Sequence, residues 1–241
     1  MQQSPSLRTP SPKSKEERRQ ERLRQGLLPS PSTKSPGTRA KTVYLIRHGE
    51  SLAQRVGREA RKTDSSLLDC GLTAEGKRQA MSLRSQLGDD KYQSLELVVS
   101  SPLTRALMTA CLGFSEHPIL CHYHLREIGS LIPENIPRST QAVFQDLVAS
   151  GVDKETLQRI DVETLQPELW PKHHDTPPKV VRRDRIRDAF GYLMQRPEQT
   201  LAIVCHYHVI RAALSSQEIR PTNACVIECR LCGGELRLAH C

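Results

Sequence analysis

Two side chains with evident chemical potential, Arg47 and His48, directly follow the apolar run Val43-Tyr44-Leu45-Ile46. Arg carries a fixed positive charge that pairs with anions, and His offers a ring nitrogen that can act as a base or nucleophile. The apolar run predicts a buried strand, and Gly49 permits a tight exit from it before Glu50. Open α/β sheets bind ligands at the carboxyl ends of their strands. This tetrad is therefore predicted to lie at a ligand site.

A second imidazole follows a second apolar run. Residues Leu201–Cys205 are predicted as a buried strand, His206 stands at its end, and a helix is expected directly afterwards. The start of a helix offers unpaired backbone N–H groups and the positive end of the helix dipole. Both features favour an anionic ligand beside His206.

Two more charged residues are candidates for the site only because of the motifs around them. Arg105 stands within Ser100–Ala106, after a short strand, and Ser101 is predicted to cap the helix that carries it. Glu127 comes shortly after a strand predicted over Ile119–Tyr123. Taken alone, Arg105 is typical of a solvated helix face and Glu127 of an exposed loop.

The order of these motifs resembles the histidine phosphatase (phosphoglycerate mutase-like) superfamily, whose signature is an Arg-His-Gly-Glu tetrad after the first strand. Residues 72–80 match its Leu-Thr-x-x-Gly-x-x-Gln-Ala segment, residues 101–106 match its Ser-x-Leu-x-Arg-Ala frame, and His206 matches its second His. The resemblance covers residues 41–241. It implies an α/β fold, a three-layer αβα sandwich around a central, mostly parallel sheet.

The resemblance also implies a role for each residue. His48 attacks phosphorus, Arg47 and Arg105 bind the phosphoryl oxygens, and His206, when protonated, stabilises the charge that develops on them. Glu127 is the general acid, provided that its surroundings keep it neutral. The implied reaction is hydrolysis of a phosphomonoester through a phosphohistidine, with no cofactor and no metal. Insert segments typical of glycolytic mutases are absent, which favours a phosphatase over a mutase.

One departure from the family pattern opens an alternative function. Tyr207 stands where the family normally has Gly after its second His. Its bulk would narrow the pocket, and it leaves open a catalytically weak or inactive pseudophosphatase that binds a phosphorylated ligand or a partner protein. A zinc site drawn from the repeated Cys-His-Tyr-His strings at 121–124 and 205–208 and from Cys229 and Cys232 is disfavoured, because these residues lack paired ligand spacing.

The net charge of +8 belongs mostly to an N-terminal tail. Residues 1–40 hold nine Lys or Arg and three Glu, a net charge of +6, together with six Pro and seven Ser. Such a segment buries too little apolar surface to offset its chain entropy, so we expect it to be disordered. Its Ser-Pro and Thr-Pro pairs, at positions 4, 9, 11, 30 and 35, suggest that proline-directed kinases act on it.

Composition narrows the setting and the partners. Eight cysteines scattered over residues 70–241 favour reduced thiols and a cytoplasmic chain. No apolar run approaches the length of a membrane span, and an aromatic content of 4% argues against a specific nucleic-acid platform. The expected partner is a small phosphorylated metabolite or a phosphoprotein substrate.

The remaining elements complete the sandwich. Thr73 is predicted to cap a helix, residues 51–69 to form a loop, and residues 139–150 and 153–160 to form helices. Lys179–Gln195 is predicted as an amphipathic helix, and two alternating runs about Gly233-Gly234 as a hairpin. The exposed face of the long helix is expected to carry Arg182, Arg183, Arg185 and Arg187.

Overall fold

The computed structural model describes residues 40–128, 132–162, 165 and 179–239 of the 241, with backbone alone for 179–183. The chain divides into two units, Met1–Gly37 and Thr38–Cys241. The predicted tail, except for Ala40, and its Ser-Pro and Thr-Pro sites lie outside the described residues. So does the stretch from 166 to 178.

The described residues form a seven-stranded sheet with the strand order β4-β3-β2-β5-β1-β6-β7. Neighbours from β4 to β1 are parallel, whereas β6 runs antiparallel to β1 and β7 antiparallel to β6. This confirms the predicted fold class. The strands are β1 Lys41–Arg47, β2 Leu97–Ser100, β3 Ile119–Cys121, β4 Ile160–Asp161, β5 Thr200–Cys205, β6 Val226–Cys232 and β7 Glu235–Leu238.

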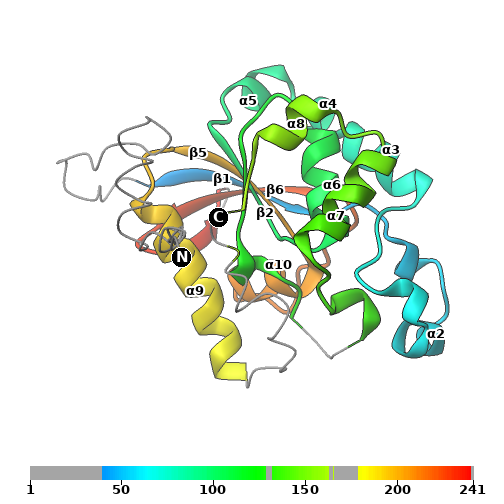
Figure 1. Ribbon diagram of the computed structural model, residues 1–241. Coiled ribbons are helices and arrows are strands. Elements are labelled where there is room, and N and C mark those ends of the chain that lie inside the picture. Colours follow the sequence, from blue (N-terminus) through cyan, green and yellow to red (C-terminus); the bar gives the residue numbers. More distant parts are fainter. Residues whose placement is uncertain (1–39, 129–131, 163–164, 166–178, 240–241) are drawn as a thin grey trace, which may run out of the picture. The chain divides into compact units, whose positions relative to one another are not determined.

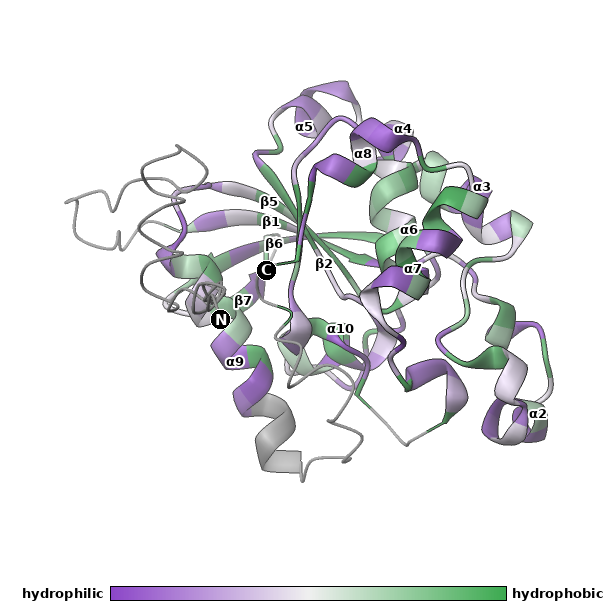
Figure 2. Ribbon diagram, viewed as in Figure 1, coloured by the Kyte–Doolittle hydropathy of each residue, from purple (hydrophilic) through white to green (hydrophobic). Residues whose placement is uncertain are grey.

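Helices cover both faces of the sheet, with α9 and α10 on one side and α3 to α8 on the other (Figure 1). The helices are α2 Arg58–Thr63, α3 Ala74–Met81, α4 Leu83–Leu87, α5 Asp89–Gln93, α6 Thr104–Gly113, α7 Thr140–Ala149, α8 Lys154–Gln158, α9 Lys179–Gln195 and α10 Tyr207–Ala213. Alternation along β1 explains the two layers, because Tyr44 and Ile46 enter one apolar cluster while Val43 and Leu45 enter the other. Figure 2 shows this apolar interior along the strands, with polar colouring outward on the helices.

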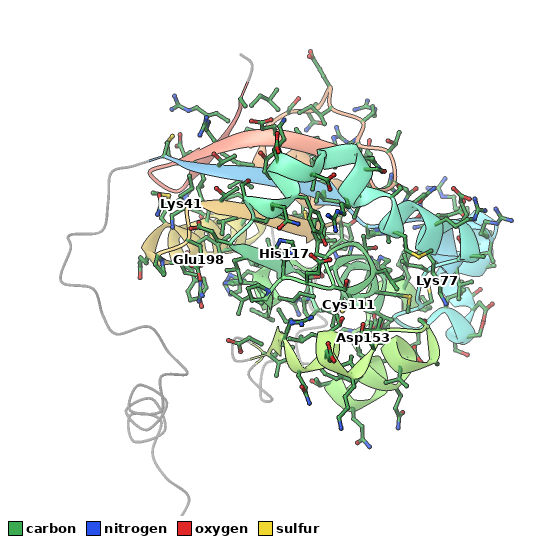
Figure 3. All side chains as sticks on the ribbon, turned by 90° about the horizontal axis from the view of Figure 1, so that it is seen from above. Lys41, Lys77, Cys111, His117, Asp153 and Glu198 are labelled. Carbon is green, nitrogen blue, oxygen red and sulfur yellow. The ribbon has the colours of Figure 1, made fainter. Side chains whose placement is uncertain are left out.

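The two ends of the parallel strands differ in what holds them. At the starting end, Lys41 is buried and its ammonium donates to the carbonyl oxygens of Arg196 and Glu198, the latter over 2.8 Å. Figure 3 shows Lys41 and Glu198 together at this edge. These contacts tie the start of β1 to the segment that leads into β5. The polar residues of the tetrad lie at the opposite end.

Several local predictions are confirmed. Thr73 caps α3, with its hydroxyl accepting from the N–H of Gly76 over 2.9 Å. Gly233 and Gly234 turn the β6–β7 hairpin with positive φ angles of 57° and 84°. Ile186, Phe190 and Leu193 of α9 are buried.

Three local predictions are wrong. Residues 51–69 were expected to be a loop but contain α2 and two short 3-10 helices. The segment 153–160 was expected to be wholly helical, but α8 ends at Gln158 and Ile160 begins β4. Arg185 was placed on the exposed face of α9 but is buried, because its guanidinium donates to the carbonyl oxygen of Arg126 over 2.9 Å. Arg187 is exposed as predicted, and the side chains of Arg182 and Arg183 lie outside the described residues.

None of the helices among the described residues combines the length and apolar composition that a membrane span requires.

Candidate active site

The two strand-end histidines lie side by side. β1 and β5 are parallel neighbours in which Arg47 pairs with Cys205, so His48 and His206 leave the sheet at the same level. The backbone N–H of His48 donates to the carbonyl oxygen of Cys205 over 3.0 Å, and the two ring centroids are 5.1 Å apart. Both imidazoles are buried.

The backbone fixes the tautomer of His48. Its Nδ1 lies 2.7 Å from the carbonyl oxygen of Gly49, and because a carbonyl oxygen only accepts, Nδ1 carries the proton. The other nitrogen, Nε2, is therefore unprotonated in the neutral ring. Burial, and then the positive charge of Arg105, hold the pKa of His48 well below its usual value of 6.5. The ring is thus a neutral base with its lone pair on Nε2.

Arg105 reaches that lone pair from α6. Its Nε donates to Nε2 of His48 over 3.3 Å. The rest of the guanidinium is held by the short 3-10 helix Pro133–Asn135, through the carbonyl oxygen of Glu134 and through Oδ1 of Asn135 at 2.9 Å. Arg61, on α2, pairs in turn with the Glu134 carboxylate. Arg105 is therefore a fixed cation at the reactive nitrogen of His48.

Ser101 orients the second imidazole instead of capping a helix. Helix α6 begins at Thr104 with Leu103 as its N-cap, so the predicted capping role of Ser101 is wrong. The Ser101 hydroxyl accepts from the N–H of Leu103 over 3.3 Å and lies 2.7 Å from Nε2 of His206. While it accepts from Leu103, the hydroxyl still has its own proton to donate. Donation of that proton to Nε2 of His206 corresponds to the tautomer with the ring proton on Nδ1. Among the described residues Nδ1 has no hydrogen-bond partner.

The charge state of His206 differs from the prediction. Burial, followed by the charge of Arg105, holds its pKa well below 6.5, so the ring is neutral in this structure. The prediction gave His206 its role on the condition that the ring is protonated, so that it donates a hydrogen bond to a phosphoryl oxygen. The neutral ring with its proton on Nδ1 still offers one N–H donor to an oxygen anion.

Arg47 is held by Pro221 and by an aromatic ring. Its Nη1 donates to the carbonyl oxygen of Pro221 over 2.8 Å, and its guanidinium lies 5.3 Å from the ring centroid of Tyr207. Arg211 lies 5.4 Å from the same ring. The phenol of Tyr207 therefore packs beside Arg47. Nε of Arg47 has no hydrogen-bond partner among the described residues.

Glu127 makes two contacts as a hydrogen-bond acceptor. Its Oε1 accepts from the N–H of Ile128 over 2.7 Å, and its Oε2 lies 3.4 Å from Nδ1 of His208. Its side chain is 12% exposed, whereas that of His208 is 55% exposed. Burial lowers the pKa of Arg47, and the negative charge of Glu127 opposes that lowering.

The start of α3 packs against the backbone of the Arg-His-Gly-Glu tetrad. A β-carbon on Gly49 would meet the carbonyl oxygen of Gly76 at 2.4 Å, and one on Gly76 would meet that of Glu50 at 2.1 Å. The N–H of Glu50 donates to Oε1 of Gln79 over 2.9 Å. The absence of a side chain at Gly49 and at Gly76 therefore lets the backbone of the tetrad and that of α3 approach closely.

The structure thus brings Arg47, His48, Arg105 and His206 together and places Glu127 beside them. Sequence reasoning missed Ser101 and Asn135, and it considered His208 only as a zinc ligand. The repeated Cys-His-Tyr-His string was a signal for His208. Within the described residues, no group of three or more His, Cys, Asp or Glu side chains could hold a metal ion.

Comparisons with known proteins agree with this geometry. A family model described as "Histidine phosphatase superfamily (branch 1)" matches residues 43–232. "Phosphoglycerate mutase-like protein 1" of Arabidopsis thaliana is 38% identical over 115 residues, which cover 46% of this chain and 40% of that protein. The matched part is therefore less than half of that relative's length.

Two solved structures share the fold. The ecdysone phosphate phosphatase EPPase from Bombix mori, in complex with tungstate, has a TM-score of 0.54 at 15% identity and covers 79% of this chain and 89% of its own. A phosphoglycerate mutase from Bacillus anthracis str. Sterne has a TM-score of 0.53 at 14% identity, covering 84% and 93%. At these identities the likeness concerns the fold.

Proposed function

We propose that this chain, which belongs to the histidine phosphatase superfamily, hydrolyses a phosphomonoester through a phosphohistidine on His48. The observation that carries the proposal is the tautomer of that ring. Its Nδ1 donates to the carbonyl oxygen of Gly49, so the lone pair is on Nε2, where it accepts from the Arg105 guanidinium over 3.3 Å. A neutral imidazole with its lone pair directed at a fixed cation is suited to attack a phosphoryl group that the cation holds.

The first step transfers the phosphoryl group from the ester to the enzyme. Arg105 and Arg47 bind nonbridging oxygens, Nε2 of His48 bonds to phosphorus, and the bond to the ester oxygen breaks. Nδ1–H of His206 donates to an oxygen whose charge grows in the transition state. Arg47 contributes the Nε donor that is without a partner among the described residues. Fixed donors of this kind need no reorganisation during the reaction.

The second step returns the phosphoryl group to water. Glu127 gives a proton to the leaving alkoxide in the first step and takes one from water in the second, when water attacks the phosphohistidine. Inorganic phosphate then leaves, and the bond between Nε2 and phosphorus is broken. Hydrolysis is proposed in preference to mutase chemistry, because the sequence lacks the insert segments typical of glycolytic mutases.

The proposed substrate is a small phosphorylated metabolite or a phosphoprotein. Two arginines match a phosphate monoester by charge, and the two neutral imidazoles supply a lone pair and an N–H donor. The reaction as written requires neither metal nor cofactor. The described cysteines form no disulfide, which supports the proposal of a cytoplasmic setting. Proline-directed kinases remain proposed partners of the tail, which lies outside the described residues.

The proposal is tested by hydrolysis of p-nitrophenyl phosphate in the presence of EDTA. We expect the wild-type chain to turn over and His48→Ala to be inactive while still folded by circular dichroism. Activity that depends on an added divalent metal, or that survives in His48→Ala, would contradict the proposal.

Tyr207 is the reason that a catalytically weak or inactive pseudophosphatase, acting as a binding module, is the alternative function. Its ring lies 5.3 Å from the Arg47 guanidinium, at a position where the family normally has Gly. If folded wild-type protein binds phosphate but hydrolyses nothing, the pseudophosphatase alternative is favoured. Tyr207→Gly would then be the variant to test for restored turnover.

A further inference from the structure

His208, the last residue of the second Cys-His-Tyr-His string, contacts the candidate general acid Glu127. It stands two residues after His206, at the second position of α10. Its Nδ1 lies 3.4 Å from Oε2 of Glu127, and its ring packs edge-on against Tyr207 with the centroids 5.1 Å apart. The imidazole is mostly solvent-exposed, and the carboxylate is mostly buried. The pair therefore joins the site to bulk water.

The charges around His208 come from three elements. Glu127 faces it from the loop after the 3-10 helix Tyr123–Leu125, Arg47 from the end of β1, and Arg211 from the next turn of α10. The hydrogen bond to Glu127 raises the pKa of His208 above 6.5, against the lowering effects of burial and of both arginines. Below that raised pKa, the imidazole keeps a proton next to the carboxylate.

We propose that His208 is the proton reservoir of Glu127, so that the acid–base group of this site is a carboxylate–imidazole pair rather than a lone carboxylic acid. The inference rests on the proposed phosphatase function and deepens it. It also accounts for a difficulty in the sequence-based mechanism, which required the surroundings of Glu127 to keep it neutral. The carboxylate instead accepts from Ile128 and faces an imidazole, so the proton can be stored on the partner.

The proton balance is as follows. As the bond between phosphorus and the ester oxygen breaks, the proton on Nδ1 of His208 passes to Glu127, and a carboxyl proton passes to the leaving oxygen. His208 is left neutral and Glu127 ionised. When water attacks the phosphohistidine, its proton goes to Glu127 and returns to His208. No proton is gained or lost by the pair over one turnover.

Two esters of similar shape separate proton delivery from positioning. Phenyl phosphate has a poor leaving group that needs a proton, whereas p-nitrophenyl phosphate leaves readily without one. We expect His208→Gln to lower kcat/KM for phenyl phosphate about tenfold or more and to affect p-nitrophenyl phosphate much less, since acid–base catalysis contributes about 10²–10⁴ in rate. In the wild type, kcat/KM for phenyl phosphate should fall as pH rises through the raised pKa of His208. His208→Gln should lack that fall.

A double mutant tests whether His208 acts through Glu127. If it does, Glu127→Gln combined with His208→Gln should be no slower on phenyl phosphate than Glu127→Gln alone. Lys91→Gln is a matched control. It breaks the ion pair of Lys91, on α5, with Glu228, on β6, which spans 2.8 Å. The exposed fractions of these two side chains, 51% and 23%, are comparable with those of His208 and Glu127. Lys91→Gln should leave both esters unaffected.

The role of His208 would be overturned if His208→Gln slowed both esters equally, or if the losses in the double mutant were additive. It would also be overturned if His208→Gln kept the wild-type pH profile for phenyl phosphate. These results differ from a failure of the proposed function, in which the wild type would hydrolyse neither ester or would do so without His48.

Discussion

At the scale of single residues, the chemistry of the site depends on where protons sit. The carbonyl oxygen of Gly49 accepts from Nδ1 of His48 and so keeps that ring's proton on Nδ1. The Ser101 hydroxyl lies beside Nε2 of His206 and, when it donates, keeps that ring's proton on Nδ1 as well. Burial keeps both rings neutral. One ring is thereby a nucleophile and the other a donor, although the two side chains are identical in type.

The lowered histidine pKa values predict how stability depends on pH. His48 and His206 take up protons near pH 6.5 when unfolded but only well below it when folded. Below pH 6.5 the unfolded chain therefore binds more protons than the folded chain, so the free energy of unfolding decreases as the pH falls. His122, whose pKa burial lowers to about 4, acts in the same direction.

Urea unfolding measured between pH 7.5 and 5 checks this expectation. Among the described residues, Asp69 and His208 oppose the trend, because their pKa values are raised in the folded state and both favour folding as pH falls. We expect a net loss of stability on acidification that is smaller in His206→Asn. Stability that rises steadily from pH 7 to pH 5 would contradict neutral buried histidines.

At the scale of elements, α6 matters because it carries Arg105. Its N-cap residue, Leu103, has no side-chain acceptor, and Asp69 supplies one from a distant loop. The Asp69 carboxylate accepts from the N–H of Thr104 over 2.9 Å and from its hydroxyl over 2.8 Å. Asp69 is fully buried and adopts a positive φ of 43°. The turn that contains Asp69 thus fixes the start of the helix one residue before Arg105.

We expect Asp69→Ala to lower the free energy of unfolding by about 1–3 kcal/mol, because it leaves buried donors of Thr104 unpaired. It should also reduce kcat/KM for p-nitrophenyl phosphate by loosening Arg105. Asp69→Asn, which keeps an acceptor oxygen, should cost less on both counts. Urea unfolding at pH 7 and steady-state kinetics measure the two effects. Equal effects of the alanine and asparagine variants would argue against the capping role.

The sequence predicted elements better than contacts. Apolar runs ending in polar residues located β1, β5 and the histidines that follow them, because a strand end is a local property of the chain. Ser101 was predicted to be a helix cap, yet its hydroxyl contacts His206, more than a hundred residues away. Arg185 was expected in solvent because α9 is basic, but packing against the Arg126 backbone buries it. Long-range partners of this kind leave no local pattern.

At the scale of the whole molecule, the candidate site belongs to one unit of the chain. Every residue assigned a role lies within Thr38–Cys241, and the family match spans 43–232. The strand order brings β1, β5 and β2 together, so that Arg47, His206 and the start of α6 meet at one edge. The tail carries most of the net charge and none of these residues.

Deletion of residues 1–37 should therefore leave kcat/KM for p-nitrophenyl phosphate and the midpoint of urea unfolding unchanged. The full-length chain is the control. A truncated protein that folds but loses turnover would show that the tail completes the site. The proposed kinase sites can be examined separately by mass spectrometry of full-length protein from its native cell.

The central claim is that His48 becomes phosphorylated during turnover, and trapping that intermediate tests it most directly. Wild-type protein mixed with p-nitrophenyl phosphate is quenched in alkali within the first turnovers and measured by intact mass and peptide mapping. We predict one added phosphoryl group on His48 that survives base, is lost in acid, and is absent from His48→Ala. A wild-type enzyme that turns over without such a group, or that carries it on another residue, would contradict the account.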